Sequence, residues 1–145
     1  METYHWMLVS AFIGASSALF AAYWRTRYTI KSQDLSKRLE DLCDAIGILE
    51  EVSCKYWCNT TAKKEKPSEH YILGYKTKIS MIVNYLDDAY SQFSKEKTSK
   101  LLAEFFEACT GGSFHSGDEP QRLRKILIKG EALKIELLKI RSQLY

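Results

Sequence analysis

A short segment rich in glycine and serine, residues 110–117, is the part of the chain best suited to binding an anion. It has the sequence TGGSFHSG, and basic residues follow it on the first turns of the expected last helix. Successive glycine and serine amides can form a concave anion site, and a helix N-terminus adds partial positive charge. The candidate residues for a phosphate or nucleotide site are Gly111, Gly112, Ser113, His115, Arg122, Arg124 and Lys125.

The same segment has a structural interpretation. Asp118 and Glu119 already complement the start of the following helix and would repel a phosphate. A glycine after a helix commonly ends it by adopting the left-handed conformation. The pattern therefore favours a glycine C-cap and a flexible connection, with Phe114 against the helices, over an anion site.

The cysteines are the next residues whose types allow chemistry. Cys54 and Cys58 lie one helical turn apart and, with Cys109 or His115, are the only plausible zinc ligands. A closed zinc site needs four converging ligands, and no compact Cys-x-x-Cys pair is present. We therefore expect no metal, and we expect these cysteines and Cys43 to be reduced, small core residues.

No arrangement in the sequence is typical of a catalytic site. The histidines His5, His70 and His115 are scattered, and adjacent acids such as Asp87 and Asp88 diverge around a helix. The chain has no phosphate-binding loop of the Walker type, no dinucleotide fingerprint and no nucleophile elbow. We expect no enzymatic activity and no cofactor.

Helices must position all of these residues. The chain of 145 residues contains only seven glycines and two prolines, too few turn signals for a sandwich or barrel. Apolar residues instead recur every three or four positions in four segments, which predicts four amphipathic helices and an all-α bundle. The predicted seams are Leu35, Leu39, Leu42, Ile46, Leu49 and Tyr56; Ile72, Tyr75, Ile79, Ile82, Leu86, Ala89 and Phe93; Leu101, Leu102, Phe105, Phe106 and Cys109; and Leu123, Ile126, Leu133, Leu137, Ile140 and Leu144.

The N-terminal segment differs from this body because it is uncharged. All 21 Lys and Arg residues follow position 24, and the 19 residues from Trp6 to Trp24 carry no charge. At about 1.5 Å per residue such a helix spans roughly 28 Å, close to the thickness of the hydrocarbon core of a bilayer. Tyrosine and tryptophan flank both ends, where membrane interfaces favour them. The sequence therefore predicts a single transmembrane helix.

The basic residues that follow the span set its expected orientation. Positive flanks stay in the cytoplasm, so the N-terminus should lie outside and the C-terminus inside, with the span in the cell inner membrane. We expect residues 1–28 to form an outward tail and the transmembrane helix, and residues 29–145 to form a cytoplasmic bundle of about four helices. A cleaved signal peptide and a buried core helix are the alternatives.

Small residues form a stripe along the predicted span. Ser10, Gly14, Ser17 and Ala21 recur at spacings of four, three and four, with Ala18 beside them. Close backbone approach across small residues is a main source of helix association in lipid. The stripe therefore predicts a self-assembly face or, in a ring of copies, a pore lining. The alternative is an anchor that happens to be rich in alanine and serine.

The architecture of an outward tail, one span and a helical cytoplasmic body resembles the small membrane accessory protein of type VI-B CRISPR systems. The resemblance covers the whole chain and rests on architecture and size. It implies assembly into a membrane pore that reinforces antiviral defence. Relatives of that group carry an Arg-x4–6-His ribonuclease motif, but no arginine here precedes a histidine at that spacing. The resemblance thus implies pore formation rather than RNA cleavage.

The expected partners follow from these interpretations. They are the lipid bilayer, further copies of the chain and a cytoplasmic protein or RNA-guided complex. The net charge of +3 is too small for a typical nucleic-acid module, so we expect no direct DNA binding. Two alternative functions remain open: a membrane-tethered helical adaptor and a nucleotide-responsive membrane regulator that uses the loop at Gly111.

Overall fold

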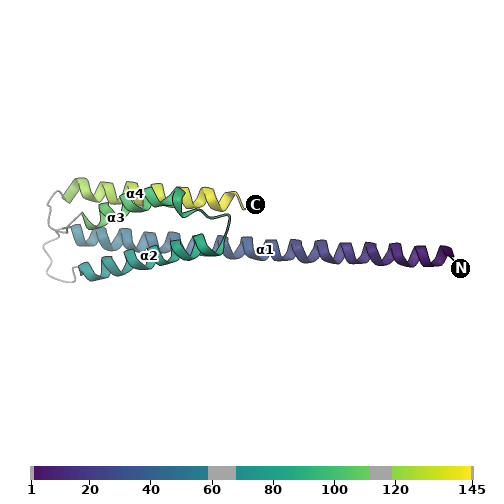
Figure 1. Ribbon diagram of the computed structural model, residues 1–145. Helices are drawn as coiled ribbons and strands as arrows, with labels where there is room; N and C mark the ends of the chain where they lie inside the picture. The colour runs from purple at the N-terminus through teal and green to yellow at the C-terminus, as the bar shows by residue number, and fades with distance from the viewer. Residues whose placement is uncertain (1, 59–67, 112–118, 145) are drawn as a thin grey trace. The chain divides into compact units, whose positions relative to one another are not determined.

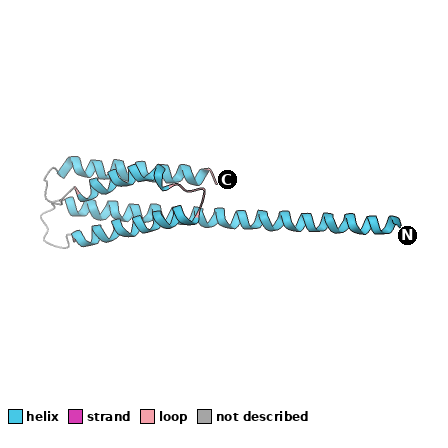
Figure 2. Ribbon diagram, in the orientation of Figure 1, coloured by secondary structure: helices cyan, strands magenta, loops and turns pink. Residues whose placement is uncertain are grey.

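The computed structural model describes residues 2–58, 68–111 and 119–144, and it places four α-helices in them (Figures 1 and 2). The helices are α1 (Glu2–Trp57), α2 (Glu69–Ala89), α3 (Lys95–Thr110) and α4 (Glu119–Ser142). Within these described residues there is no strand, as Figure 2 shows. The prediction of an all-α fold is confirmed for this part of the chain.

Helix α1 continues without a break from the apolar N-terminal segment into the first amphipathic segment. Residues 25–34 contain threonines that weaken helix propensity, so their sequence is compatible with either a continuation or an interruption. The hydroxyls of Thr26 and Thr29 donate to the carbonyls of Ala22 and Arg25, one turn earlier, at 2.9 Å each. The helix therefore accommodates both hydroxyls on its own carbonyls, and the threonines do not interrupt it.

The chain divides after Asp34 into two units. The first unit is one helical segment, and every described side chain from Tyr4 to Lys31 in it is exposed. The sequence placed the boundary six residues earlier, at 28–29. The second unit begins at Leu35 and contains the remaining part of α1 together with α2, α3 and α4.

The second unit is a bundle around one hydrophobic core. Each of its four helical segments contributes side chains of which 1% or less is exposed: Leu35, Leu39, Leu42, Ile46, Leu49, Ile72, Ile79, Leu86, Phe105, Ile126, Leu133 and Leu137. The predicted seams are therefore confirmed in outline, because all of these residues belong to them. Some positions differ: Ala89 of the predicted α2 seam is exposed, and Val83 is buried in the core although it was not predicted there. The core also contains residues outside the predicted seams, namely Ala45, Trp57 and Tyr90.

Helices α3 and α4 approach each other closely at Gly130. A Cβ atom on this glycine would lie 3.2 Å from the ring of Phe105 on α3 and 3.0 Å from the carboxylate of Glu50 on α1. In the sequence Gly130 interrupts the apolar seam of the fourth segment, and a residue without a side chain in such a seam leaves room for a close neighbour. The structure confirms that the small residue allows the contact.

Serines stand at the N-caps of two helices, and neither serine side chain donates or accepts a capping hydrogen bond. Ser68 and Ser94 occupy the N-cap positions of α2 and α3 in extended conformations. The carboxylate of Asp87 accepts a hydrogen bond from the backbone N–H of Lys95, the first residue of α3, at 2.8 Å and so helps begin that helix. Helix α4 begins at Glu119, as a cap at Asp118 predicts, although Asp118 lies outside the described residues.

Candidate functional site

The small residues of the first unit share one side of α1. At about 100° per residue, Ser10, Gly14, Ser17 and Ala21 fall within roughly 60° of one another around the helix. Ala18 borders this sector. Nothing lies within 4 Å of the position that a Cβ atom on Gly14 would take, so the backbone there is open to a close neighbour.

The two serines of this stripe are satisfied within their own helix. The hydroxyl of Ser10 donates to the carbonyl of Met7 at 2.9 Å, and that of Ser17 donates to the carbonyl of Gly14, also at 2.9 Å. An unsatisfied donor in hydrocarbon would cost several kcal/mol, so these bonds make both serines compatible with a lipid environment. Each hydroxyl oxygen also keeps acceptor capacity for another group.

Large apolar side chains occupy the remainder of this segment and are exposed. They include Leu8, Phe12, Ile13, Leu19 and Phe20, each with more than 60% of its surface accessible. Within the described residues, α1 is the one helix that is long and apolar enough to cross a membrane, with a mean hydropathy of 1.5 over its best stretch. By length and composition, the predicted span is thus a candidate membrane helix.

The second candidate site lies at one end of the bundle, around Gly111. This residue ends α3 in the left-handed conformation, with φ of 63°, and its N–H donates to the carbonyl of Glu107 at 2.7 Å. Glycine is required here because of that φ and because an added Cβ would collide with the guanidinium of Arg122. The predicted glycine C-cap is confirmed.

Arg122 is held by an aromatic ring. Its Cζ lies 4.1 Å from the centroid of the Trp57 ring, a cation–π contact between α4 and the end of α1. The indole Nε1 of Trp57 in turn donates to the carbonyl of Cys109 on α3 at 2.8 Å. The Trp57 ring therefore connects α1 with both α3 and α4, and the sequence interpretation of Arg122 as a phosphate ligand did not anticipate this contact.

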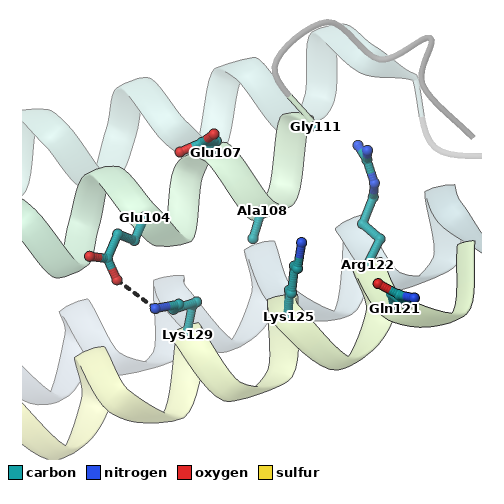
Figure 3. Close-up of a pocket in the computed structure, with 8 residues that line it drawn as sticks. All are labelled: Glu104, Glu107, Ala108, Gly111, Gln121, Arg122, Lys125 and Lys129. Atoms are coloured by element: carbon teal, nitrogen blue, oxygen red, sulfur yellow. Dashed lines mark hydrogen bonds and ion pairs between the residues drawn. The ribbon is translucent and has the colours of Figure 1, made fainter. Parts of the chain in front are cut away.

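A pocket of about 350 Å³ opens between α3 and α4 next to this contact (Figure 3). Its lining residues are Glu104, Glu107, Ala108, Gly111, Gln121, Arg122, Lys125 and Lys129. Glu104 and Lys129 form an ion pair at 2.6 Å across the pocket wall. The hydrogen bond and charge of Lys129 lower the pKa of Glu104 from its usual value.

The pocket brings together only part of the predicted anion site. Gly111, Arg122 and Lys125 line it, whereas Arg124 is not among its lining residues and is exposed. Gly112, Ser113 and His115 lie outside the described residues. Sequence reasoning missed two carboxylates of the lining, which oppose phosphate binding. Their spacing of three on α3 indicates that the two carboxylates share one helix face, but the sequence pattern does not show which helix that face meets.

A second ion pair lies deeper in the bundle. The Nζ of Lys134 on α4 is 3.0 Å from the Glu50 carboxylate on α1, and these side chains are 22% and 10% exposed. Lys134 also pairs with Glu131 one turn earlier. Burial lowers the pKa of Lys134, but hydrogen bonds and charge from both glutamates outweigh it, so the pKa is raised. Lys134 is therefore charged at neutral pH.

The cysteines are free thiols in different environments. Burial raises the pKa of Cys109 to about 12, partly offset by a hydrogen bond with Ser53, and burial also raises the pKa of Cys43 and Cys54. The predicted ligand combination included His115, which lies outside the described residues. In residues 2–58, 68–111 and 119–144, no three His, Cys, Asp or Glu side chains gather where they could hold a metal ion.

These environments predict the order in which the thiols react. Treatment of the folded protein with iodoacetamide at mildly alkaline pH should modify the exposed Cys58 first and Cys109 last, because only the accessible thiolate is nucleophilic. Mass spectrometry of timed digests measures the order. Unfolding with guanidinium should make the four rates similar, and alkylation of Cys109 at the rate of Cys58 before unfolding would contradict the buried position.

Comparison with known proteins gives no relative for this chain: no protein-family model, curated protein or solved structure matches it.

Proposed function

We propose that the protein is a single-pass membrane protein that assembles through its span and permeabilises the bilayer. One observation carries the proposal: between Trp6 and Trp24, ten large apolar or aromatic side chains are exposed and none is charged. Exposing each to water costs about 1.5–3 kcal/mol relative to burial, on the order of 20 kcal/mol together. This exceeds the typical stability of a whole domain, about 5–15 kcal/mol, so the segment requires an apolar environment.

The charges beside the span give its proposed orientation. Arg25, Arg27 and Lys31 follow the apolar stretch within two turns, and the N-terminal side carries only Glu2. Positive residues remain on the cytoplasmic side during insertion. The N-terminus therefore faces outward from the inner membrane, and the bundle lies in the cytoplasm.

The small-residue stripe provides the proposed contact between copies. Gly14 is open to a neighbouring helix, and the serine hydroxyls need no outside acceptor. A single helix cannot enclose a water path, so permeation requires several copies around it, with Ser10 and Ser17 available as lining groups. A role in antiviral defence, which the resemblance to the CRISPR accessory protein implies, belongs to the same proposal.

Gly14→Leu tests both assembly and permeation. The leucine side chain should separate the helices and lower the leakage of dye from liposomes by about tenfold, since each 1.4 kcal/mol of lost association is a factor of ten. The mass of the detergent-solubilised particle measures assembly in parallel. Ala15→Leu is the matched control, because it adds similar bulk about 100° away around the helix. Full leakage and full particle mass in Gly14→Leu would refute the assembly face.

A membrane-tethered adaptor is the second candidate. The bundle exposes large aliphatic side chains on α4, including Leu127, Ile128 and Ile135, which a partner protein could cover. In this case the span would serve only for localisation. Replacing residues 1–24 with an unrelated span should then preserve activity in cells, whereas a membrane-permeabilising protein should lose it.

A further inference from the structure

Helix α2 carries an exposed stripe that the bundle does not use. Its residues recur at alternating spacings of three and four, the period at which two helices meet along a common seam. They are Tyr71, Gly74, Lys78, Met81, Tyr85 and Asp88, and all are exposed. Nothing lies within 4 Å of the position that a Cβ on Gly74 would take, which leaves room for a bulky side chain from outside.

Helix α4 carries a second stripe with the same spacing. It consists of Arg124, Leu127, Glu131, Lys134, Leu138 and Arg141. Four of these residues are exposed, whereas Lys134 and Arg141 are partly buried because they pair with Glu50 and Glu40 on α1. Leu127 and Leu138 each expose at least half of their surface, and so do Ile128 and Ile135 at the border of the stripe. Four exposed aliphatic residues on one helix are more than scattered surface positions would explain.

The two stripes belong to helices that run the same way on opposite sides of the bundle. Figure 1 shows α4 along one side and α2 along the other, with α3 and the second half of α1 between them. A contact between the α4 stripe of one copy and the α2 stripe of the next is therefore heterologous. Repetition of such a contact around an axis produces a ring.

The sequences of the stripes match in one register. When Glu131 is placed level with Lys78, Leu138 comes level with Tyr85 and Leu127 with Gly74, because both stripes step in the same order of three and four. In this register Arg124 also meets the Tyr71 ring. Lys134 comes level with Met81 and Arg141 with Asp88, but these two basic side chains are directed to Glu50 and Glu40 of their own bundle. One pair of opposite charges, one pair of a cation with a ring and one apolar pair thus coincide along the two stripes.

Pairing each stripe with itself is less favourable. Two parallel α4 stripes would place Glu131 against Glu131, and two parallel α2 stripes would place Lys78 against Lys78. Like charges at an interface are destabilising. Pairing an α4 stripe with an α2 stripe instead places Glu131 opposite Lys78.

We propose that the α4 stripe of one copy docks onto the α2 stripe of the next copy, with Glu131 facing Lys78 and Leu138 facing Tyr85. The proposal rests on the proposed function in one respect: copies anchored in one bilayer have the same orientation, so their α2 and α4 helices can meet in parallel. The bundle then contributes an assembly contact that is separate from the span.

A charge exchange tests the contact in the full-length protein. Lys78→Glu places two carboxylates together, so the detergent-solubilised particle should require an approximately tenfold higher protein concentration to assemble, a factor equivalent to about 1.4 kcal/mol. The double variant Lys78→Glu/Glu131→Lys restores an opposite pair and should recover assembly. Lys97→Glu on the exposed side of α3 makes the same change in charge and should have no effect.

The outcomes separate this contact from the proposed function. A monomeric wild-type particle would overturn both. A wild-type oligomer that Lys78→Glu leaves unchanged, or that the double variant fails to restore, would overturn only the contact between α2 and α4. Thermal unfolding confirms that each variant retains its bundle.

Covalent trapping provides a second test that does not depend on the charge variants. In a Cys58→Ser background, the chain carrying both Tyr85→Cys and Leu138→Cys should form a ladder of disulfide-linked oligomers on mild oxidation. Each single variant should remain monomeric on a denaturing gel, because the two positions come from different stripes. Dimers of a single variant at the level of the double variant would overturn the heterologous pairing.

Discussion

Replacing Phe105 with alanine should lower the free energy of unfolding of the bundle by about 3–5 kcal/mol. The Phe105 ring on α3 is fully buried. It lies against Gly130 of α4, and its centroid is 6.2 Å from that of Phe106. Truncation removes apolar contacts and leaves a cavity that the packed helices can fill only in part.

Denaturant unfolding of the detergent-solubilised chain, followed by far-ultraviolet circular dichroism, measures this loss. Leu73→Ala is the control, because Leu73 on α2 is 41% exposed and its replacement should change stability by no more than about 0.5 kcal/mol. If Phe105→Ala had as small an effect as the control, the ring could not be at the centre of the core.

Glu50→Ala should destabilise the bundle by about 3 kcal/mol, the lower end of the range for breaking a buried ion pair. The variant leaves Lys134 without its partner on α1, in a position where only 22% of the side chain is exposed. The expected loss of stability is at the lower end of this range because Lys134 retains Glu131 as a second partner.

Removing both charges should give a different result. In Glu50→Leu/Lys134→Met no charge is left buried, and apolar side chains of similar size occupy the space, so stability should be close to that of the wild type. Each single variant, Glu50→Leu and Lys134→Met, completes the double-mutant cycle. Additive losses in the four unfolding curves would contradict a direct interaction between the two side chains.

The hydrophobic seams made most of the bundle predictable from the sequence. Leu35 to Leu49, Ile72 to Leu86 and Ile126 to Leu137 recur at helical spacing, and burial of such a face is the main driving force of helix packing. Gly130 was predictable as a close approach for the same reason, since a residue without a side chain in a seam leaves space. The exception at Ala89 arises because α2 ends there and Tyr90 adopts an extended conformation.

The ion pairs of the bundle could not be predicted. Glu50 and Lys134 are 84 residues apart, and each looks like a solvated residue in its own helix. The pairing depends on which faces of α1 and α4 meet, a property that the period of one helix does not contain. The same holds for Glu104 and Lys129, 25 residues apart in the wall of the pocket.

Of the candidate anion site, only the conformation of Gly111 could be predicted from the sequence. A glycine at the end of an apolar series predicts a C-cap, and Gly111 forms one. Its basic neighbours were grouped by position along the chain, but a helix separates consecutive residues around its axis by about 100°. Arg122 therefore turns to the Trp57 ring while Arg124 belongs to the exposed stripe of α4.

The contact of Trp57 with two other helices affects how the bundle opens. Trp57 is the last residue of α1, Cys109 is next to the last residue of α3, and Arg122 is in the first turn of α4. Helix ends ordinarily fray independently, at little cost in free energy. Here the indole on α1 contacts the ends of both α3 and α4, so fraying of α1 removes a contact from each of them, and fraying of α3 or α4 removes a contact from α1. The three ends should therefore lose or keep their order together, as one cooperative unit.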